Sequence, residues 1–191
     1  MINNKKIFAV VGLAGVGKSQ VVERLSKNVN GAVVYFGGIV LAELERRGLP
    51  SSPENERIVR EALRDEHGMA AMAVIGEKLI RQHIDLGSCV VVDGLYSNEE
   101  LTVLREAFGT DLEILSVHAD KSVRAARLCV RKTRPLTYEQ MLERDEAEID
   151  KLNKAKPIVV GDYHIVNNST LDNLHHTIDN LPITNCCTQD E

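Results

Sequence analysis

The stretch that most constrains this 191-residue chain is GLAGVGKS, residues 12–19, which follows the apolar run IFAVV. Its spacing, G-x-x-x-x-G-K-S, is typical of loops that bind the phosphates of a nucleoside triphosphate. Glycine lets the backbone adopt positive φ and approach a ligand closely. The loop amides and the positive end of the following helix then face an anion. In this pattern the lysine reaches the outer phosphates and the serine hydroxyl holds Mg²⁺.

The flanks of the loop have the structure that the motif requires. Residues 7–11 are apolar and β-branched or aromatic, as in a buried strand, and residues 19–29 place their apolar side chains on one helical face. We therefore predict that the chain binds ATP and Mg²⁺. The expected ATP-binding residues here are Gly12, Ala14, Gly15, Val16, Gly17, Lys18, Ser19 and Gln20, with Lys18 also catalytic and Ser19 also a metal ligand.

Strand-like and helix-like segments alternate along the whole chain, which predicts an α/β fold: a parallel sheet with helices on both faces. Capping boxes mark two helix starts, Ser97 with Glu100 and Thr137 with Gln140. We expect strands at 7–11, 32–36, 89–94, 112–118 and 163–167, and helices at 19–29, 39–49, 52–68, 69–87, 97–109, 120–130, 137–152 and 170–181. One domain is expected over residues 1–183, followed by a polar tail, 184–191, that contains Cys186 and Cys187.

An acid ends the third expected strand. In open parallel sheets, ligands bind beyond the carboxyl ends of the strands, and Asp93 closes the run CVVVD. Many strands end in Asp as a turn former, but beside a phosphate-binding loop a carboxylate can hold Mg²⁺ or accept a proton from an attacking hydroxyl. We predict that Asp93 is both catalytic and a metal ligand.

The segment 124–134 concentrates positive charge, with five cations in eleven residues and no acid among them. Like charges at this density repel unless an anion neutralises them, and a triphosphate in a charge-rich transition state is such an anion. Pro135 then interrupts the chain, so we expect a short mobile lid at about 127–144. Arg131, Arg134 and Arg144 are the candidate catalytic arginines, although the neighbouring acids could simply pair with Arg144.

Composition argues against several classes of protein. The net charge of −5 disfavours a general nucleic-acid binder, and no apolar run is long enough to span a membrane. The apolar part of the N-terminus is too short for a signal peptide, and the cysteines lack zinc spacing. We expect a cytoplasmic monomer or homodimer whose partner is a small molecule, with no nucleic acid and no membrane.

With these residues in place, the chain resembles the nucleotide-kinase branch of P-loop proteins. It is similar to adenylate kinase and dephospho-CoA kinase, and most similar to a group of small, mostly archaeal proteins that resemble both. The resemblance covers residues 7–181 and rests on GLAGVGKS, VVVDG, VHADKSVRAARL, ERDEAE and GDYHIVNNSTLDNL. It implies a three-layer P-loop NTPase fold with the sheet order 2-3-1-4-5 and a short helical lid.

The resemblance also implies roles for individual residues. Arg127 would lie against the nucleobase and Asn167 beside it, which adds both to the ATP-binding set. Arg131 would meet the triphosphate, and Arg134 and Arg144 would close on the transferring phosphoryl group.

Departures from the related sequences fall on the acceptor side. Tyr96 and Ser97 stand where relatives have arginine, and Ile39 follows Gly38 where the group tends to have Asp. A tyrosine suits stacking on a ring or holding a ribose. We assign Gly38, Arg64 and Tyr96 to acceptor binding; the cations that could bind an acceptor phosphate from the helices are Arg46, Arg47, Arg57, Arg60 and Arg64.

The sequence therefore predicts an ATP-dependent phosphotransferase that moves the γ-phosphoryl group to a small nucleotide-like acceptor. A nucleoside or a conjugate such as dephospho-CoA is preferred over a simple monophosphate. The alternative is a non-catalytic nucleotide sensor or switch that acts through a partner. A GTPase switch would need Asn-Lys-x-Asp, whereas residues 153–156 read NKAK. A P-loop ATPase that processes nucleic acid is disfavoured by the acidic balance and by the absence of a second basic or aromatic patch.

Overall fold

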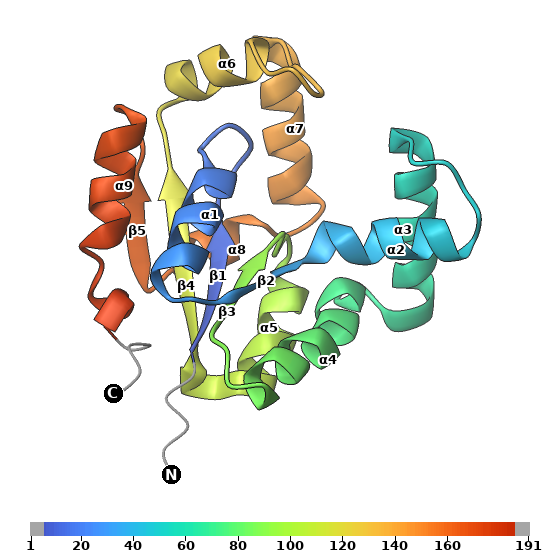
Figure 1. The fold of residues 1–191 in the computed structure, drawn as a ribbon. Coiled ribbons are helices and arrows are strands. Elements are labelled where there is room, and N and C mark those ends of the chain that lie inside the picture. The colour runs from blue at the N-terminus through green and yellow to red at the C-terminus, as the bar shows by residue number, and fades with distance from the viewer. Residues whose placement is uncertain (1–5, 186–191) are drawn as a thin grey trace.

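The computed structural model describes residues 6–185 and contains one five-stranded parallel sheet in the order β2-β3-β1-β4-β5 (Figure 1). The expected α/β class and strand order are confirmed. The strands are β1 (Ile7–Val11), β2 (Ala32–Tyr35), β3 (Val90–Asp93), β4 (Leu112–His118) and β5 (Tyr163–Val166). In register, Val10 of β1 lies opposite Asp93 of β3, so the phosphate-binding loop and the acid leave the sheet side by side.

Nine α-helices are seen in the described part of the chain. They are α1 (Lys18–Asn28), α2 (Phe36–Arg46), α3 (Pro53–His67), α4 (Ala71–Asp85), α5 (Asn98–Phe108), α6 (Lys121–Cys129), α7 (Tyr138–Asp150), α8 (Ala155–Val159) and α9 (Leu171–Asp179). Two short 3₁₀ helices, η1 (Gly109–Asp111) and η2 (Pro182–Asn185), complete the elements. Both expected capping boxes form, at α5 and at α7.

Alternation along β1 builds a core on each face of the sheet. Ile7, Ala9 and Val11 face a cluster with α2, α3, α4 and α5, whereas Phe8 and Val10 face α1 and α9. All five side chains are fully buried. Central strands covered on both faces are expected to be apolar throughout, which explains why the run IFAVV shows no polar alternation.

Two elements differ from expectation. The second strand ends at Tyr35 and α2 begins at Phe36, so Gly37 and Gly38 lie in the first turn of a helix rather than after a strand. Because Gly37 has no side chain, the ring of Tyr35 packs directly over it: a Cβ there would lie 2.2 Å from that ring and would displace it. The helix α8 was not expected, because it is only five residues long and contains Pro157, which is tolerated near a helix start.

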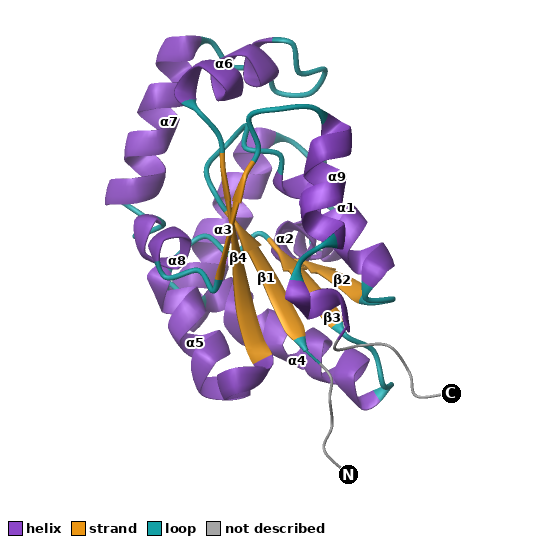
Figure 2. Ribbon diagram, turned by 90° about the vertical axis from the view of Figure 1, so that its left-hand side faces the viewer, coloured by secondary structure: helices purple, strands orange, loops and turns teal. Residues whose placement is uncertain are grey.

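The helices α6 and α7 lie beyond the carboxyl ends of the strands, at the end of the sheet opposite the chain termini (Figures 1 and 2). The segment between them, 130–137, is almost entirely exposed and forms the tip of the expected lid. No helix in residues 6–185 is long and apolar enough to cross a membrane. Cys186 and Cys187 lie outside the described residues.

Candidate active site

The phosphate-binding loop is held in its shape by contacts with Asn167, which Arg127 in turn bonds. Gly17, with φ of 97°, precedes α1 and offers no side chain to the amides of the first turn. A Cβ on Gly17 would lie 2.4 Å from Nδ2 of Asn167, and this nitrogen donates to the Val16 carbonyl at 2.8 Å. Arg127 donates in turn to the carbonyl and side-chain oxygens of Asn167. The buried Asn167 therefore braces the loop, and its amide group contacts the loop backbone.

Lys18 is folded back onto the loop. Its Nζ donates to the carbonyls of Gly12 and Leu13, at 2.9 Å and 3.0 Å. Burial lowers the pKa of Lys18 to about 7, and the nearby Lys154 adds to the effect. Burial also raises the pKa of Asp93, against the attraction of Lys18. An incoming phosphate would stabilise the charged lysine.

A cavity of about 460 Å³ lies above this loop. The expected site residues that line it are Ala14, Gly15, Gly17, Lys18, Ser19, Gln20, Asp93, Tyr96, Arg127, Arg131, Arg134 and Arg144. Gly12 and Val16, which belong to the loop, do not line the cavity, and neither does Asn167, which bonds the Val16 carbonyl. We call this the donor cavity.

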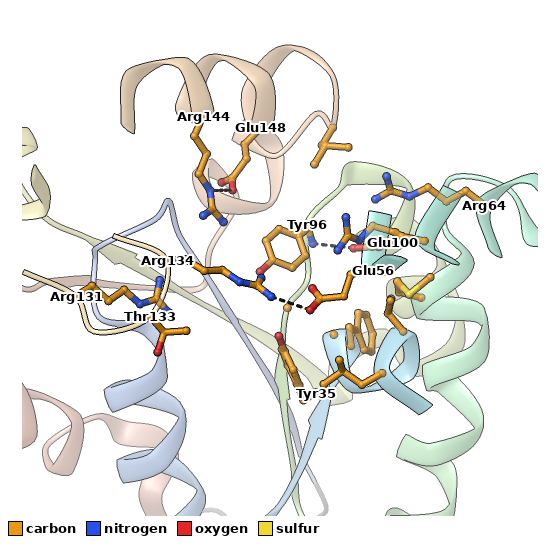
Figure 3. Close-up of a pocket in the computed structure, with 18 residues that line it drawn as sticks. Tyr35, Glu56, Arg64, Tyr96, Glu100, Arg131, Thr133, Arg134, Arg144 and Glu148 are labelled. Atoms are coloured by element: carbon orange, nitrogen blue, oxygen red, sulfur yellow. Dashed lines mark hydrogen bonds and ion pairs between the residues drawn. The ribbon is translucent and has the colours of Figure 1, made fainter. Parts of the chain in front are cut away.

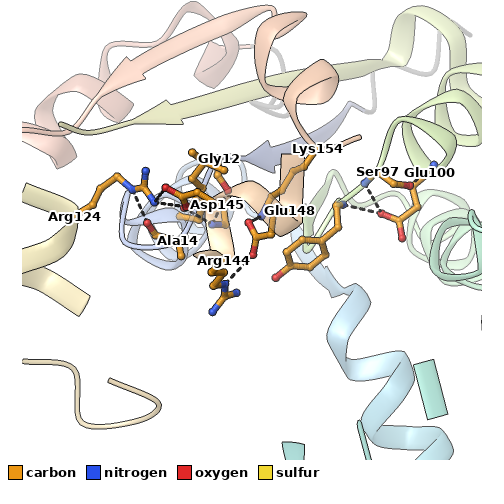
Figure 4. Close-up of polar contacts among 12 residues, drawn as sticks. Gly12, Ala14, Ser97, Glu100, Arg124, Arg144, Asp145, Glu148 and Lys154 are labelled. Carbon is orange, nitrogen blue, oxygen red and sulfur yellow. Dashed lines mark hydrogen bonds and ion pairs between the residues drawn. The ribbon is translucent and has the colours of Figure 1, made fainter. Parts of the chain in front are cut away.

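Arg124 does not belong with the other cations of its stretch. It is 3% exposed, donates through Nε to the Ala14 carbonyl at 2.7 Å, and donates through Nη2 to both oxygens of Asp145 at 2.6 Å and 2.8 Å (Figure 4). The grouping of Arg124 with triphosphate-neutralising arginines is therefore wrong. A paired, fully buried arginine is a structural tie between the loop, α6 and α7.

A second cavity of about 400 Å³ adjoins the first, and Figure 3 shows the side chains that line it. Its walls carry the aromatic rings of Tyr35, Phe36 and Tyr96 and the side chains of Arg60 and Arg64 from α3. Gly37 lines it, and Gly38 does not. Of the other helix arginines, Arg46 and Arg47 bond Glu43, and Arg57 bonds Glu61. We call this the acceptor cavity.

Two buried polar atoms in the wall of the acceptor cavity have no partner among the described residues, Nε of Arg64 and Oε1 of Glu100. The other oxygen of Glu100 accepts from the amides of Tyr96 and Ser97, at 2.7 Å and 3.2 Å. Burial raises the pKa of Glu100 to about 7. Buried polar groups normally have partners, so leaving these two atoms unpaired in the wall of the cavity costs free energy.

The segment expected to form a lid reaches the acceptor cavity. Arg134, at the lid tip, donates to Oε1 of Glu56 in α3 at 2.7 Å, and its backbone has φ of 54°. Arg144 of α7 donates through Nε to Glu148, at 2.8 Å. Sequence reasoning raised this neighbouring acid as an alternative partner for Arg144, and the structure bears it out.

Several residues of the site escaped the sequence. Tyr35 ends an ordinary strand, Glu56 lies in a helix dense with charges, and Lys154 lies in a polar stretch. The capping box did identify Glu100, but only as a helix start. Nothing in their local patterns marks the rest, because α3 and α7 meet the site only after the chain has folded.

Comparison with known proteins places the chain in a class. Residues 11–144 match the AAA domain family. A gluconokinase from Sinorhizobium meliloti has a similar fold, with a TM-score of 0.56 at 18% identity over 91% of this chain and 89% of that one. A shikimate kinase from Aquifex aeolicus gives 0.55 at 18% identity, over 90% and 93%. The fold is that of the P-loop kinases.

Closer relatives narrow this to a family. The UPF0200 protein of Aeropyrum pernix is 37% identical over 171 residues, which cover 90% of this chain and 89% of that protein. The chain belongs to the UPF0200 family, whose members here are archaeal. Fold and family together support a nucleotide-binding protein with a kinase-like architecture.

Proposed function

We propose that the protein is an ATP-dependent phosphotransferase that moves the γ-phosphoryl group to a small nucleotide-like acceptor. One observation carries this proposal: the donor and acceptor cavities share a wall. That wall is built from Tyr35, Tyr96, Arg131, Arg134 and Arg144. A phosphoryl group passing between two bound molecules would lie near these three arginines. Phosphoryl transfer is catalysed mainly by such positioning and charge stabilisation.

The roles of the residues follow from their places. The loop amides and Lys18 would hold the donor phosphates, Arg127 would flank the nucleoside, and the three shared arginines would stabilise charge on the transferring group. Asp93 lines the donor cavity and could take the proton of an attacking hydroxyl.

Mg²⁺ fits the oxygen ligands of the donor cavity. Ser19 and Asp93 both line it, one with a hydroxyl and one with a carboxylate, and Mg²⁺ is commonly held by one or two carboxylates together with substrate phosphates and waters. When bound, the ion would neutralise charge on the phosphate oxygens.

The acceptor should carry both a ring and an anionic or polar group. Tyr35, Phe36 and Tyr96 offer aromatic surface for a base or sugar. Arg60 and Arg64 supply the cations that the positions of Tyr96 and Ser97 lack, so a phosphate at the α3 end of the cavity would be neutralised. A phosphate-bearing conjugate such as dephospho-CoA, attacking through a ribose hydroxyl, meets both demands, as does a nucleoside monophosphate.

The test is a panel of nucleosides, nucleoside monophosphates and dephospho-CoA, assayed with Mg-ATP for ADP and for the phosphorylated product. Lys18→Met should lower turnover at least 100-fold, as the loss of a major charge-stabilising donor does. Lys27→Met, an exposed lysine on the same helix, is the matched control and should not change it. ATP hydrolysis that no acceptor stimulates would favour the switch instead.

A further inference from the structure

A fully buried lysine lies next to the shared wall. Lys154 is 1% exposed, at the turn between α7 and α8. Lysine is almost never fully buried unless it is paired, because removing an ammonium group from water costs several kcal/mol. Its burial therefore calls for a partner, and the nature of that partner indicates its role.

Two groups hold the ammonium of Lys154. Its Nζ donates to Oε2 of Glu148 at 2.5 Å, and Figure 4 shows both side chains. The same Nζ lies 4.3 Å from the centre of the Tyr96 ring. Burial alone would raise the pKa of Glu148, but Lys154 and Arg144 outweigh it and lower that pKa. Glu148 is therefore charged near neutral pH and bridges two cations.

The backbone is bent to bring Lys154 inward. The preceding Asn153 has φ of 51°, in the left-handed region that asparagine adopts more readily than most other non-glycine residues. It is held there by the bond from Nδ2 of Asn153 to Glu99, and the amide of Lys154 donates to the Glu148 carbonyl.

Glu148, which is held by Lys154, also holds Arg144. Its second oxygen, Oε1, accepts from Nε of Arg144 at 2.8 Å. Arg144 lines both cavities, and its two terminal nitrogens have no hydrogen-bond partner among residues 6–185. The Glu148 carboxylate is thus held by Lys154 through one oxygen, and through the other it holds Arg144, whose terminal nitrogens face the site.

We propose that Lys154 is a positioning residue for phosphoryl transfer: through Glu148 it holds the Arg144 guanidinium at the wall shared by the two cavities. The inference rests on the proposed function. Arg144 would contact the transferring phosphoryl group, and Lys154 would act only through Glu148 and Arg144. A displacement of about 1 Å in a catalytic group can lower a rate about 100-fold.

The central experiment is a double-mutant cycle with Lys154→Met and Arg144→Ala. We expect Lys154→Met to lower kcat about 10- to 100-fold, with a less than about threefold change in the KM for ATP. Added to Arg144→Ala, it should cause no further loss, because the group it positions is already absent. Additive losses in kcat would overturn the proposal.

Folding is controlled separately. Lys154→Met leaves Glu148 without its buried partner, whereas Lys154→Met with Glu148→Gln removes both charges and should regain stability. We expect that double variant to melt near the wild type yet to keep the low kcat. Recovery of kcat together with stability would mean that Lys154 is only structural. Lys151→Met, an exposed lysine in the same turn, should behave as wild type.

A binding measurement separates this inference from the proposed function. The same cycle is read as affinity for ADP with aluminium fluoride, which mimics the transferring phosphoryl group and needs no acceptor. Non-additive losses of affinity for this complex would support the positioning role of Lys154 even if no acceptor were phosphorylated. If Arg144→Ala bound this complex as tightly as wild type, Arg144 would have no role for Lys154 to support, and the inference would fail.

Discussion

Two arginines ten residues apart, Arg124 and Arg134, belong to the same charged stretch and do opposite things. Arg124 is 3% exposed and makes three hydrogen bonds that tie the phosphate-binding loop to α7. The side chain of Arg134 is 57% exposed and makes a single bond, to Glu56 across the acceptor cavity. The first fixes the site in place, and the second spans an opening.

The contrast extends to the regions around them. The loop at 12–19 is braced by Asn167 and Arg124 and carries Lys18 bonded to its own carbonyls. The lid tip at 130–135 is exposed throughout. Segments that move on binding come from the least stable parts of a protein. We therefore expect the loop backbone to stay in place and the 127–144 segment to be the part that moves when a ligand binds.

The largest effect should come from breaking the loop tie. Arg124→Met leaves Asp145 buried without its partner, which typically costs about 3–5 kcal/mol. Chemical denaturation would measure the loss. Arg24→Met, which breaks the half-exposed pair with Asp179, is the control and should hardly move the midpoint. A small loss of stability for Arg124→Met would contradict the distinction drawn between Arg124 and Arg134.

The next effect concerns the acceptor side and depends on pH. Because the folded pKa of Glu100 is raised to about 7 from 4.5, the folded state binds the proton more tightly than the unfolded state. Stability from this group is present below about pH 4.5 and is lost as the pH rises to about 7. Glu100→Gln keeps an oxygen for the Tyr96 and Ser97 amides, and should gain up to about 3 kcal/mol on wild type between pH 4.5 and 8. Parallel stability curves for the two proteins would contradict this.

Asn167→Ala should lower the free energy of unfolding by a smaller amount, because it removes the side chain that braces the phosphate-binding loop. The Val16 carbonyl would lose its buried donor, at a cost of about 1–3 kcal/mol, and calorimetry should show weaker binding of an ATP analogue. Asn168→Ala is the matched control, since Asn168 bonds only the exposed Asp120 amide in the described structure. If Asn167→Ala lost stability but kept full ATP affinity, the loop would not depend on the brace.

The smallest effect on stability belongs to the lid. Arg134→Ala should cost less than about 1 kcal/mol, because the Arg134 side chain is mostly exposed. Arg134→Ala should still lower turnover, and hydrogen exchange should show new protection at about 127–144 when an ATP analogue binds. Unchanged exchange there would mean that the lid is a rigid basic surface.

Local pattern determined much of this protein by itself. The GLAGVGKS spacing located the loop, the apolar run before it predicted a doubly covered strand, and Ser97 and Thr137 marked two helix starts that form as expected. These features could be predicted because residues close together in the chain determine them. Glycine frees the loop backbone, the period of apolar side chains separates strands from helices, and a capping side chain bonds an amide only three residues further on. The strand order was implied by resemblance and is confirmed.

Tertiary structure decided which side chains share the site. Charge density grouped Arg124 with the triphosphate-binding arginines, but packing gave it a buried partner in α7. The sequence NKAK was considered only as an incomplete guanine-reading motif, yet its Lys154 lies under Tyr96 and against Glu148. A charged side chain adopts whichever partner or solvent the fold brings to it, and that choice depends on burial and long-range contacts that no local pattern encodes.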